Sequence, residues 1–211
     1  MLEKFYTLEK DGIAEQIIQK SRFIGYAKKT ETEEEARQFI QQIKKKHYDA
    51  THNCSAYLIG QNDQIQKAND DGEPGGTAGM PILDVIKKKE LKNVTVVITR
   101  YFGGIKLGGG GLIRAYSSSA SLVLEAAGIV KMQMMQIYQV TADYSLLGFL
   151  QNALEQSVYQ LHKIDYSDYV VLEILVNAGQ ESTFETWITD TTNNRITIKA
   201  IKREYRAKKI V

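Results

Sequence analysis

Glycine and basic residues gather in one segment of the 211-residue chain, RYFGGIKLGGGGLIR at residues 100–114. Six of the protein's 16 glycines lie within nine positions there, between a β-branched run and a helix-forming run. Glycine allows positive φ angles and a close approach to a ligand. The first amides of a helix have no intrahelical acceptor, so they attract anions. With Arg100, Lys106 and Arg114 nearby, the segment predicts a site for phosphate or for a nucleic-acid backbone.

Two nucleotide-binding motifs do not fit this segment. A Walker A loop places lysine directly after the second glycine, but Gly109 follows the correctly spaced pair Gly103 and Gly108. The dinucleotide motif GxGxxG fails because Ile113 stands at its third glycine position. A purely structural role, in which the glycines let a helix pack closely on a sheet, therefore stays open beside ligand binding.

A second glycine-rich segment, DDGEPGGTAGMP at residues 70–81, supplies carboxylates. Asp70, Asp71 and Glu73 are of the type that binds a hard cation or orients a proton. Asp, Gly and Pro are also the residues of tight turns, and the segment alone favours a turn. A second glycine-rich loop in the same region favours a site that both segments share.

His52 and Cys54 are the third candidate pair. In a strand they would share one face at about 6–7 Å, too far for the hydrogen bond of a cysteine–histidine nucleophile. We therefore predict that Cys54 is a buried, small apolar residue and that His52 belongs to a cleft. One cysteine and three scattered histidines show no metal-ligand spacing, so neither a metal nor a cofactor is expected.

Composition describes an ordinary globular protein, with 43% hydrophobic and 25% charged residues. The single cysteine cannot form an internal disulfide, which favours a reducing compartment. The charged N-terminal stretch MLEKFYTLEKDG lacks the apolar core of a signal peptide. No apolar stretch approaches the about 18 residues that span a bilayer. We expect a cytoplasmic protein without a membrane partner.

A net charge of +2 does not by itself indicate nucleic-acid binding. The last strand and tail are nonetheless basic, and they could meet phosphates. A solvated edge that discourages strand pairing is the other interpretation. This segment contains one acidic residue, Glu204, and six basic residues: Lys199, Lys202, Arg203, Arg206, Lys208 and Lys209.

The first part of the chain contains the elements that must position these residues. A helix is predicted from the apolar stripe of residues 36, 39, 40 and 43, with Thr30 and Glu33 as its capping box. The run 94–102 lacks alternation, so it predicts a central strand. Further strands are predicted at 22–29 (paired with 13–18), 55–59 and 65–67, and helices at 80–88 and 112–127, the last stopped by Gly128.

From residue 133 the pattern becomes βαββαβ in under 80 residues, the ferredoxin-like order. Strands are predicted at 137–144, 159–166, 169–176 and 196–201. Ser145 would cap the first helix, and Phe184, Trp187 and Ile188 mark the second. We therefore predict an α+β protein of two domains, residues 1–132 and 133–211.

Three segments resemble the signature blocks of the IMPACT/YigZ family: ATHNCSAY (50–57), DDGEPGGTAGMPIL (70–83) and VVITRYFGGIKLGGGGLIRAY (96–116). The ferredoxin-like tail matches the bacterial branch. The resemblance implies an N-terminal α/β two-layer domain of the ribosomal-protein domain 2-like type, as in domain IV of elongation factor G. It also implies that the tail resembles the C-terminal domain of that factor.

Eukaryotic relatives regulate translation by interfering with activation of the amino-acid-starvation kinase, through contacts with its activator protein. The extra N-terminal domain of those relatives matches no part of this chain, so that mode of action is not expected here. The resemblance predicts an accessory or regulatory factor linked to translation. It would bind RNA, the ribosome or a protein partner through the glycine-rich cleft, without enzymatic turnover.

An enzyme acting on a small phosphorylated or nucleotide substrate stays open as the alternative. Asp71 or Glu73 would then hold Mg²⁺, with Arg100 and Lys106 on phosphate. In either case the residues that we place in the ligand- or nucleic-acid-binding site are His52, Asp71, Glu73, Thr77, Arg100, Gly103, Gly104, Lys106, Gly108, Gly110 and Arg114.

Overall fold

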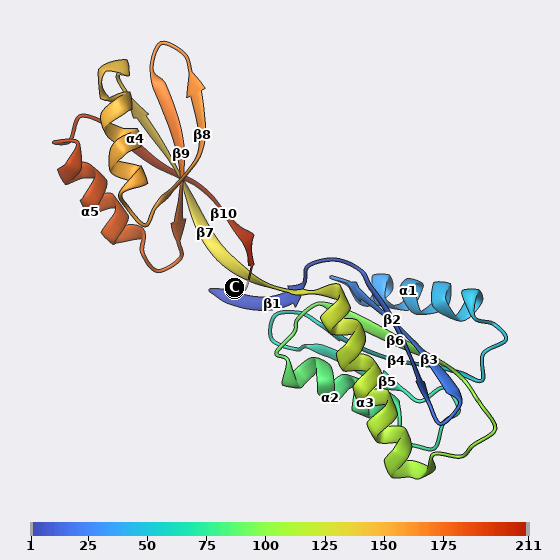
Figure 1. Cartoon of the computed structure of the whole chain (residues 1–211). Coiled ribbons are helices and arrows are strands. Elements are labelled where there is room, and N and C mark those ends of the chain that lie inside the picture. The colour runs from blue at the N-terminus through green and yellow to red at the C-terminus, as the bar shows by residue number, and fades with distance from the viewer. Residues whose placement is uncertain (1, 210–211) are drawn as a thin grey trace. The chain divides into compact units, whose positions relative to one another are not determined.

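The computed structural model describes residues 2–209 and divides into two compact units (Figure 1). The first unit contains residues 5–131, and the second contains residues 132–208 together with residues 2–4. Across these residues the fold is mixed α/β, with two five-stranded sheets and the helices α1–α5. The outermost residues of the two predicted domains, 1 and 210–211, lie outside the described part of the chain.

The sheet of the first unit has the strand order β2-β3-β6-β4-β5, with antiparallel neighbours throughout. Strand β6 is central, as its unbroken apolar run predicts, and only its last residue is not fully buried. The strands are β2 (Gly12–Ile18), β3 (Ser21–Lys29), β4 (His52–Ile59), β5 (Ile65–Asn69) and β6 (Val94–Tyr101).

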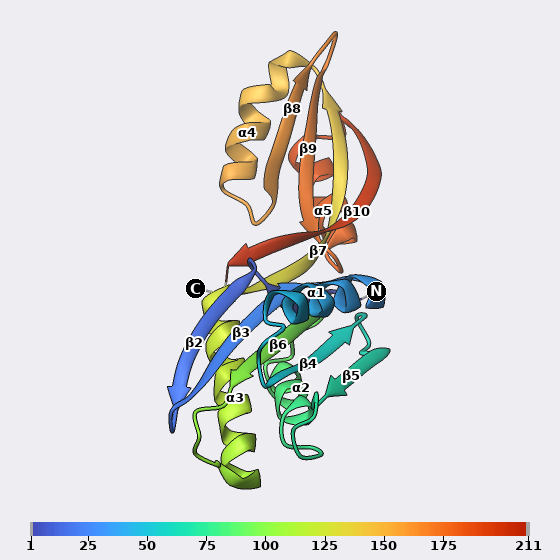
Figure 2. The ribbon, with the colours of Figure 1, turned by 90° about the vertical axis from the view of Figure 1, so that its right-hand side faces the viewer.

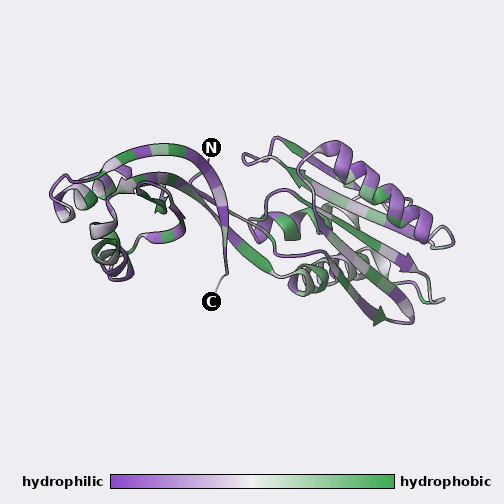
Figure 3. Ribbon diagram, turned by 90° about the horizontal axis from the view of Figure 1, so that it is seen from above, coloured by the Kyte–Doolittle hydropathy of each residue, from purple (hydrophilic) through white to green (hydrophobic). Residues whose placement is uncertain are grey.

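Helices cover both faces of this sheet (Figure 2). Helix α1 (Glu33–Lys46) packs on the face that carries Val97, while α2 (Gly79–Lys88) and α3 (Gly108–Ala127) pack on the face that carries Val96. The outer side of α1 is hydrophilic (Figure 3). The first unit therefore has three layers, one more than expected, because consecutive residues of β6 are buried on opposite faces.

The cap of α1 lies two residues later than predicted. Thr32 accepts the N–H of Glu35, whose carboxylate accepts the N–H of Glu31. Thr30 is instead buried, and its hydroxyl lies 2.7 Å from that of Thr95. Thr30, the predicted cap, is therefore bonded to the sheet, and the next threonine, Thr32, caps the helix instead.

Helix α3 begins at Gly108, four residues before the predicted start, so the four consecutive glycines form its first turn. Its predicted end is confirmed, because Gly128 has a φ of 70° directly after the last helical residue. Although α3 has 20 residues, none of the helices within residues 2–209 combines the length and apolar character needed to cross a membrane.

The second unit has the predicted element order βαββαβ. Its strands follow the order β10-β7-β9-β8, and β7 also pairs with β1 (Lys4–Leu8), of which only Lys4 belongs to this unit. Ser145 does not cap α4, because it lies inside a short 3-10 turn before that helix. The elements are β7 (Ile129–Ala142), α4 (Leu147–Glu155), β8 (Gln160–Tyr166), β9 (Val170–Asn177), α5 (Glu181–Thr191) and β10 (Thr197–Lys209).

The basic tail forms most of β10, and several of its charges are balanced. Lys202 and Arg206 both pair with Glu204, and Arg203 pairs with Glu181. The side chain of Lys209 lies outside the described residues. Much of the basic charge of β10 is therefore held in surface ion pairs.

Candidate functional site

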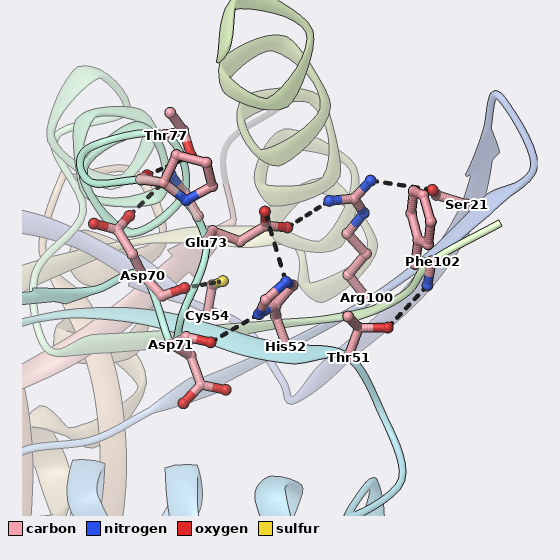
Figure 4. A network of polar contacts seen from close by, with 12 residues as sticks. Ser21, Thr51, His52, Cys54, Asp70, Asp71, Glu73, Thr77, Arg100 and Phe102 are labelled. Carbon is pink, nitrogen blue, oxygen red and sulfur yellow. Dashed lines mark hydrogen bonds and ion pairs between the residues drawn. The ribbon is translucent and has the colours of Figure 1, made fainter. Parts of the chain in front are cut away.

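A pocket of about 440 Å³ lies at the start of α3 in the first unit. All three candidate segments contribute to its wall. Five of the predicted site residues line it: His52, Glu73, Arg100, Lys106 and Gly108. Figure 4 shows the side chains of His52, Glu73 and Arg100 pointing toward one another.

Arg100 lies on the central strand and is only 5% exposed. Its Nη1 donates to Oε1 of Glu73 over 2.7 Å, and its Nη2 donates to the hydroxyl of Ser21. Its guanidinium carbon lies 5.4 Å from the ring centroids of both Phe23 and Phe102. The Nε atom is buried and has no hydrogen-bond partner among the described residues. Arg100 therefore anchors the site from within, and most of its charge is offset by Glu73.

Glu73 belongs to the loop between β5 and α2, and its side chain is 3% exposed. The same Oε1 atom accepts a hydrogen bond from the hydroxyl of Tyr116 on α3 over 2.8 Å. Burial, together with nearby Cys54 and Glu73, raises the pKa of Tyr116 well above its usual range. Tyr116 therefore remains a neutral donor, and Glu73 joins the sheet, the loop and the helix at one point.

His52 begins β4 and faces Arg100 directly across the β4–β6 ladder. Its Nδ1 lies 2.8 Å from the carbonyl oxygen of Asp71. Because a carbonyl can only accept, Nδ1 must carry the hydrogen of this bond. The other ring nitrogen, Nε2, therefore points toward the pocket, 3.7 Å from Oε2 of Glu73.

The two aspartates of the loop hold its shape. Asp70 accepts the N–H groups of Gly76, Ala78 and Gly79, so it fixes the start of α2. Partial burial acts to raise the pKa of Asp70, but these three donors outweigh it and keep the pKa below its usual value.

Asp71 is held equally firmly, with a φ of 45°. Its carboxylate accepts from Lys44 of α1 and from the N–H of Asn53. Both carboxylate oxygens of Asp71 and Oε1 of Glu73, which were expected to hold Mg²⁺, thus already accept from cationic or neutral donors, whereas Oε2 of Glu73 lies 3.7 Å from Nε2 of His52. Within residues 2–209, no group of three or more His, Cys, Asp or Glu side chains is arranged to hold a metal ion.

Cys54 is fully buried, as predicted. Its thiol donates to the carbonyl oxygen of Asp70 over 3.0 Å. Burial raises the pKa of this thiol far above its usual value. Cys54 is therefore part of the packing beneath the loop and is not an activated nucleophile.

The start of α3 presents amide groups and one lysine to the pocket. Leu107 stands at the cap position without a side-chain cap, and the first turn contains no acidic residue. Lys106 is exposed and has no ion pair among the described residues. The positive end of the helix dipole is therefore not neutralised locally.

Gly109 lines the pocket, although the sequence analysis did not place it in the site. Its φ is not positive, and a Cβ atom there would meet only Cγ2 of Thr77 at 4.0 Å. Glycine at this position weakens a helix without relieving any crowding within the described protein. Gly103 is the opposite case, because a Cβ would lie 2.0 Å from the carbonyl oxygen of Lys20 in the β2–β3 turn.

The other predicted site residues do not line this pocket. Thr77 donates to the carbonyl oxygen of Pro74 inside the loop. Arg114 lies in a separate groove between α2 and α3, beside Asp84 and Lys88. Asp71, Gly103, Gly104 and Gly110 are likewise absent from the pocket wall.

Five further residues line the pocket that were not predicted from the sequence: Thr51, Pro74, Phe102, Leu107 and Leu112. Phe102 ends the predicted run 94–102, directly after β6 and directly before the glycines, so its position carried the clearest signal.

Comparison with known proteins places this site in a family context. Residues 19–124, which contain the whole pocket, match the family described as "Impact N-terminal domain". Residues 140–195 match the family described as "Domain of unknown function (DUF1949)". The two matches fall in the first and second units, respectively.

Several relatives are similar over most of the chain. "IMPACT family member YvyE" of Bacillus subtilis (strain 168) is 50% identical over 210 residues, which cover 100% of this chain and 97% of the relative. "IMPACT family member YigZ" of Escherichia coli (strain K12) is 32% identical over 187 residues, which cover 88% and 92%.

"Protein IMPACT homolog" of Dictyostelium discoideum is 40% identical over 94 residues, which cover 43% of this chain and 27% of that protein. A solved structure, described as "Crystal structure of an hypothetical protein", has a TM-score of 0.61 and 29% identity, covering 96% of this chain and 99% of that one. On these matches, the chain belongs to the IMPACT family.

Proposed function

We infer that this IMPACT family member is an accessory factor of translation that binds RNA, and that the pocket at the start of α3 holds a phosphate group of the RNA backbone. The single observation that carries the inference is Gly109. It is helical, it is uncrowded, and it lines a pocket with its neighbouring amides uncapped. A ligand that approaches the backbone closely is the physical reason for glycine at such a position.

The charges around the pocket favour an anion. The charge of Arg100 offsets that of Glu73, so Lys106 and the positive end of α3 remain. The buried Nε of Arg100 adds a donor that has no partner among the described residues. Phosphate is the anion that helix N-termini with lysine beside them bind most readily.

RNA is favoured over a small phosphorylated substrate for two reasons. Of the four carboxylate oxygens at Asp71 and Glu73 that an enzyme of phosphoryl transfer would need for Mg²⁺, three already accept hydrogen bonds from other groups of the protein. The family resemblance, which implies domains like those of elongation factor G, supports a partner in the translation apparatus.

Sedimentation of cell lysate through a gradient tests this function at low and at moderate salt. Wild-type protein should migrate with ribosomal subunits at low salt and dissociate as salt rises, because phosphate contacts release counterions. Lys106→Ala should weaken this association. Lys10→Ala is the control. It removes the same charge from the exposed segment before β2, at the opposite end of the β2–β3 hairpin, and should leave the association with ribosomal subunits unchanged.

Arg100 is unsuitable as the probe, because its replacement would break a buried ion pair. Wild-type protein that stays in the soluble fractions at both salt concentrations would contradict the inference. Titration with nucleotides and pyrophosphate would then test the small-ligand alternative.

A further inference from the structure

Beyond phosphate binding, we propose that the RNA is single-stranded and that its bases stack on Phe102, in the pocket wall, and on Tyr48, in the loop that is hydrogen-bonded to the end of β6. This proposal rests on the function inferred above. Phe102 forms part of the pocket wall and is 46% exposed, and Tyr48, just after α1, is 87% exposed. Exposed aromatic rings next to a phosphate site are the usual platform for unpaired bases.

The segments that carry the two rings are fastened to each other. The N–H of Phe102 donates to the hydroxyl of Thr51, and the hydroxyl of Tyr101 donates to the carboxylate of Asp49. The short loop of residues 47–51 therefore lies against the end of β6. Tyr48 and Phe102 consequently stand on adjoining segments at one end of the sheet.

A hydrogen-bonded chain keeps the loop of residues 47–51 in place. The hydroxyl of Tyr26 lies 2.6 Å from Nε2 of His47, and Nδ1 of His47 lies 2.9 Å from the hydroxyl of Tyr101. Because Tyr101 donates to Asp49, its oxygen accepts from Nδ1, and Nε2 accepts from Tyr26. A platform that is ordered before binding loses less entropy when the ligand arrives.

The charges at this end of the sheet complement a nucleic-acid backbone. Lys45 and Lys46 end α1, and the ammonium of Lys46 lies 4.9 Å from the ring centroid of Tyr26. Lys20 lies in the β2–β3 turn against Gly103. These three lysines have no ion pair among the described residues, whereas Asp49 accepts from Tyr101. Unpaired cations at the same end of the sheet as exposed rings indicate a strand that offers both phosphates and bases.

A duplex cannot use this surface fully, because its bases are stacked on one another and their faces are closed. Stacking on Phe102 and Tyr48 requires bases that are free of the helix. The proposal therefore predicts a preference for single strands, which phosphate binding alone would not produce.

Fluorescence anisotropy with a labelled uridine oligonucleotide of roughly 12 residues tests the proposal, since such a length spans one binding site. The single strand should bind about tenfold more tightly than the duplex that it forms with an adenosine oligonucleotide. Tyr48→Ala and Phe102→Leu should each weaken single-strand binding about fivefold to tenfold. Tyr48→Phe keeps the ring and should bind as the wild type does. Tyr169→Ala removes a tyrosine that is 54% exposed in the second unit, and it should also change nothing.

Two outcomes separate this proposal from the function on which it rests. If Lys106→Ala weakens binding while strand and duplex bind equally and Tyr48→Ala has no effect, stacking is overturned and the phosphate site stands. If neither form of RNA binds the wild-type protein at low salt, both the stacking and the RNA-binding function are overturned.

Discussion

The guanidinium of Arg100 donates to the carboxylate of Glu73 over 2.7 Å, and the two side chains are only 6% and 3% exposed. Arg100 comes from the central strand, and Glu73 comes from the loop that precedes α2. The pair therefore fastens the second glycine-rich loop to the sheet beneath the pocket. Breaking such a pair leaves one buried charge without its partner, which costs more than the intact pair contributes.

Removing either partner of this pair should destabilise the protein strongly. We expect Arg100→Met to lower the free energy of unfolding by about 3–5 kcal/mol, because Glu73 would be left buried and charged. The double variant Arg100→Met/Glu73→Gln should lose less than the sum of the two single variants, because neither charge then remains. Urea denaturation of the four proteins measures this coupling. Strict additivity would show that the pair does not act as a unit.

Asp70 should be the residue on which the shape of the loop depends most. Asp70→Ala removes the acceptor of three backbone N–H groups, and we expect a loss of about 1–3 kcal/mol in the free energy of unfolding. Asp70→Asn keeps one acceptor oxygen and should lose less. Thermal unfolding compares the stabilities, and amide exchange at Gly76, Ala78 and Gly79 locates the effect. Unchanged protection of those amides in Asp70→Ala would contradict this role.

Stability should fall as the pH drops through the histidine range. Burial first, and then the charges of Lys46 and Arg22, lower the pKa of His47, although Asp49 acts in the opposite direction. The unfolded chain therefore binds a proton at a pH where the folded protein does not. The contribution of neutral His47 is complete above about pH 6.5 and is lost as the pH falls below that value.

Urea midpoints at pH 7.5 and pH 5.5 measure this dependence, a range that brackets the ordinary histidine value of about 6.5. We expect a smaller difference between the two midpoints for His47→Gln than for the wild type. His162→Gln is the matched control, because that ring lies on exposed β8 of the second unit. If the urea midpoint changes equally between the two pH values in His47→Gln and in the wild type, the pH dependence of stability arises from other groups.

Elements with a clear apolar pattern were predictable from the sequence, and the start of α3 was not. The run of β6 and the stripe of α1 each pointed to one structure, and both are confirmed. The four glycines before Leu112 have a poor helix propensity, so they favoured a turn. The buried face of α3, which includes Leu112 and Tyr116, packs on the sheet and the helix extends back over the glycines. Tertiary packing thus overrode local propensity.

The candidate site was predictable as a set of segments, but its contacts were not. Arg100 and Lys106 were both expected on phosphate, yet Arg100 is paired with Glu73, 27 residues away along the chain. No periodicity connects two such positions, since a loop and a strand from different parts of the sheet bring them together. Arg114 follows the glycines closely in sequence, but the turn of α3 carries it into another groove.

The phosphate-binding pocket is tested most directly by Gly109→Ala, measured for stability and for RNA affinity in one preparation. Alanine favours the helix, and its methyl group would meet only Cγ2 of Thr77 at 4.0 Å. The free energy of unfolding should therefore rise by up to about 1 kcal/mol. The same methyl group would separate a phosphate from the amides of α3, so RNA affinity should fall about tenfold.

Gly110→Ala is the matched control, because position 110 is also helical and uncrowded but does not line the pocket. It should gain stability and bind RNA as the wild type does. Gly103→Ala should instead lose stability through its contact with Lys20. We therefore expect Gly109→Ala to be more stable than the wild type and to bind RNA less tightly. A Gly109→Ala protein that gains stability and binds RNA with unchanged affinity would contradict it.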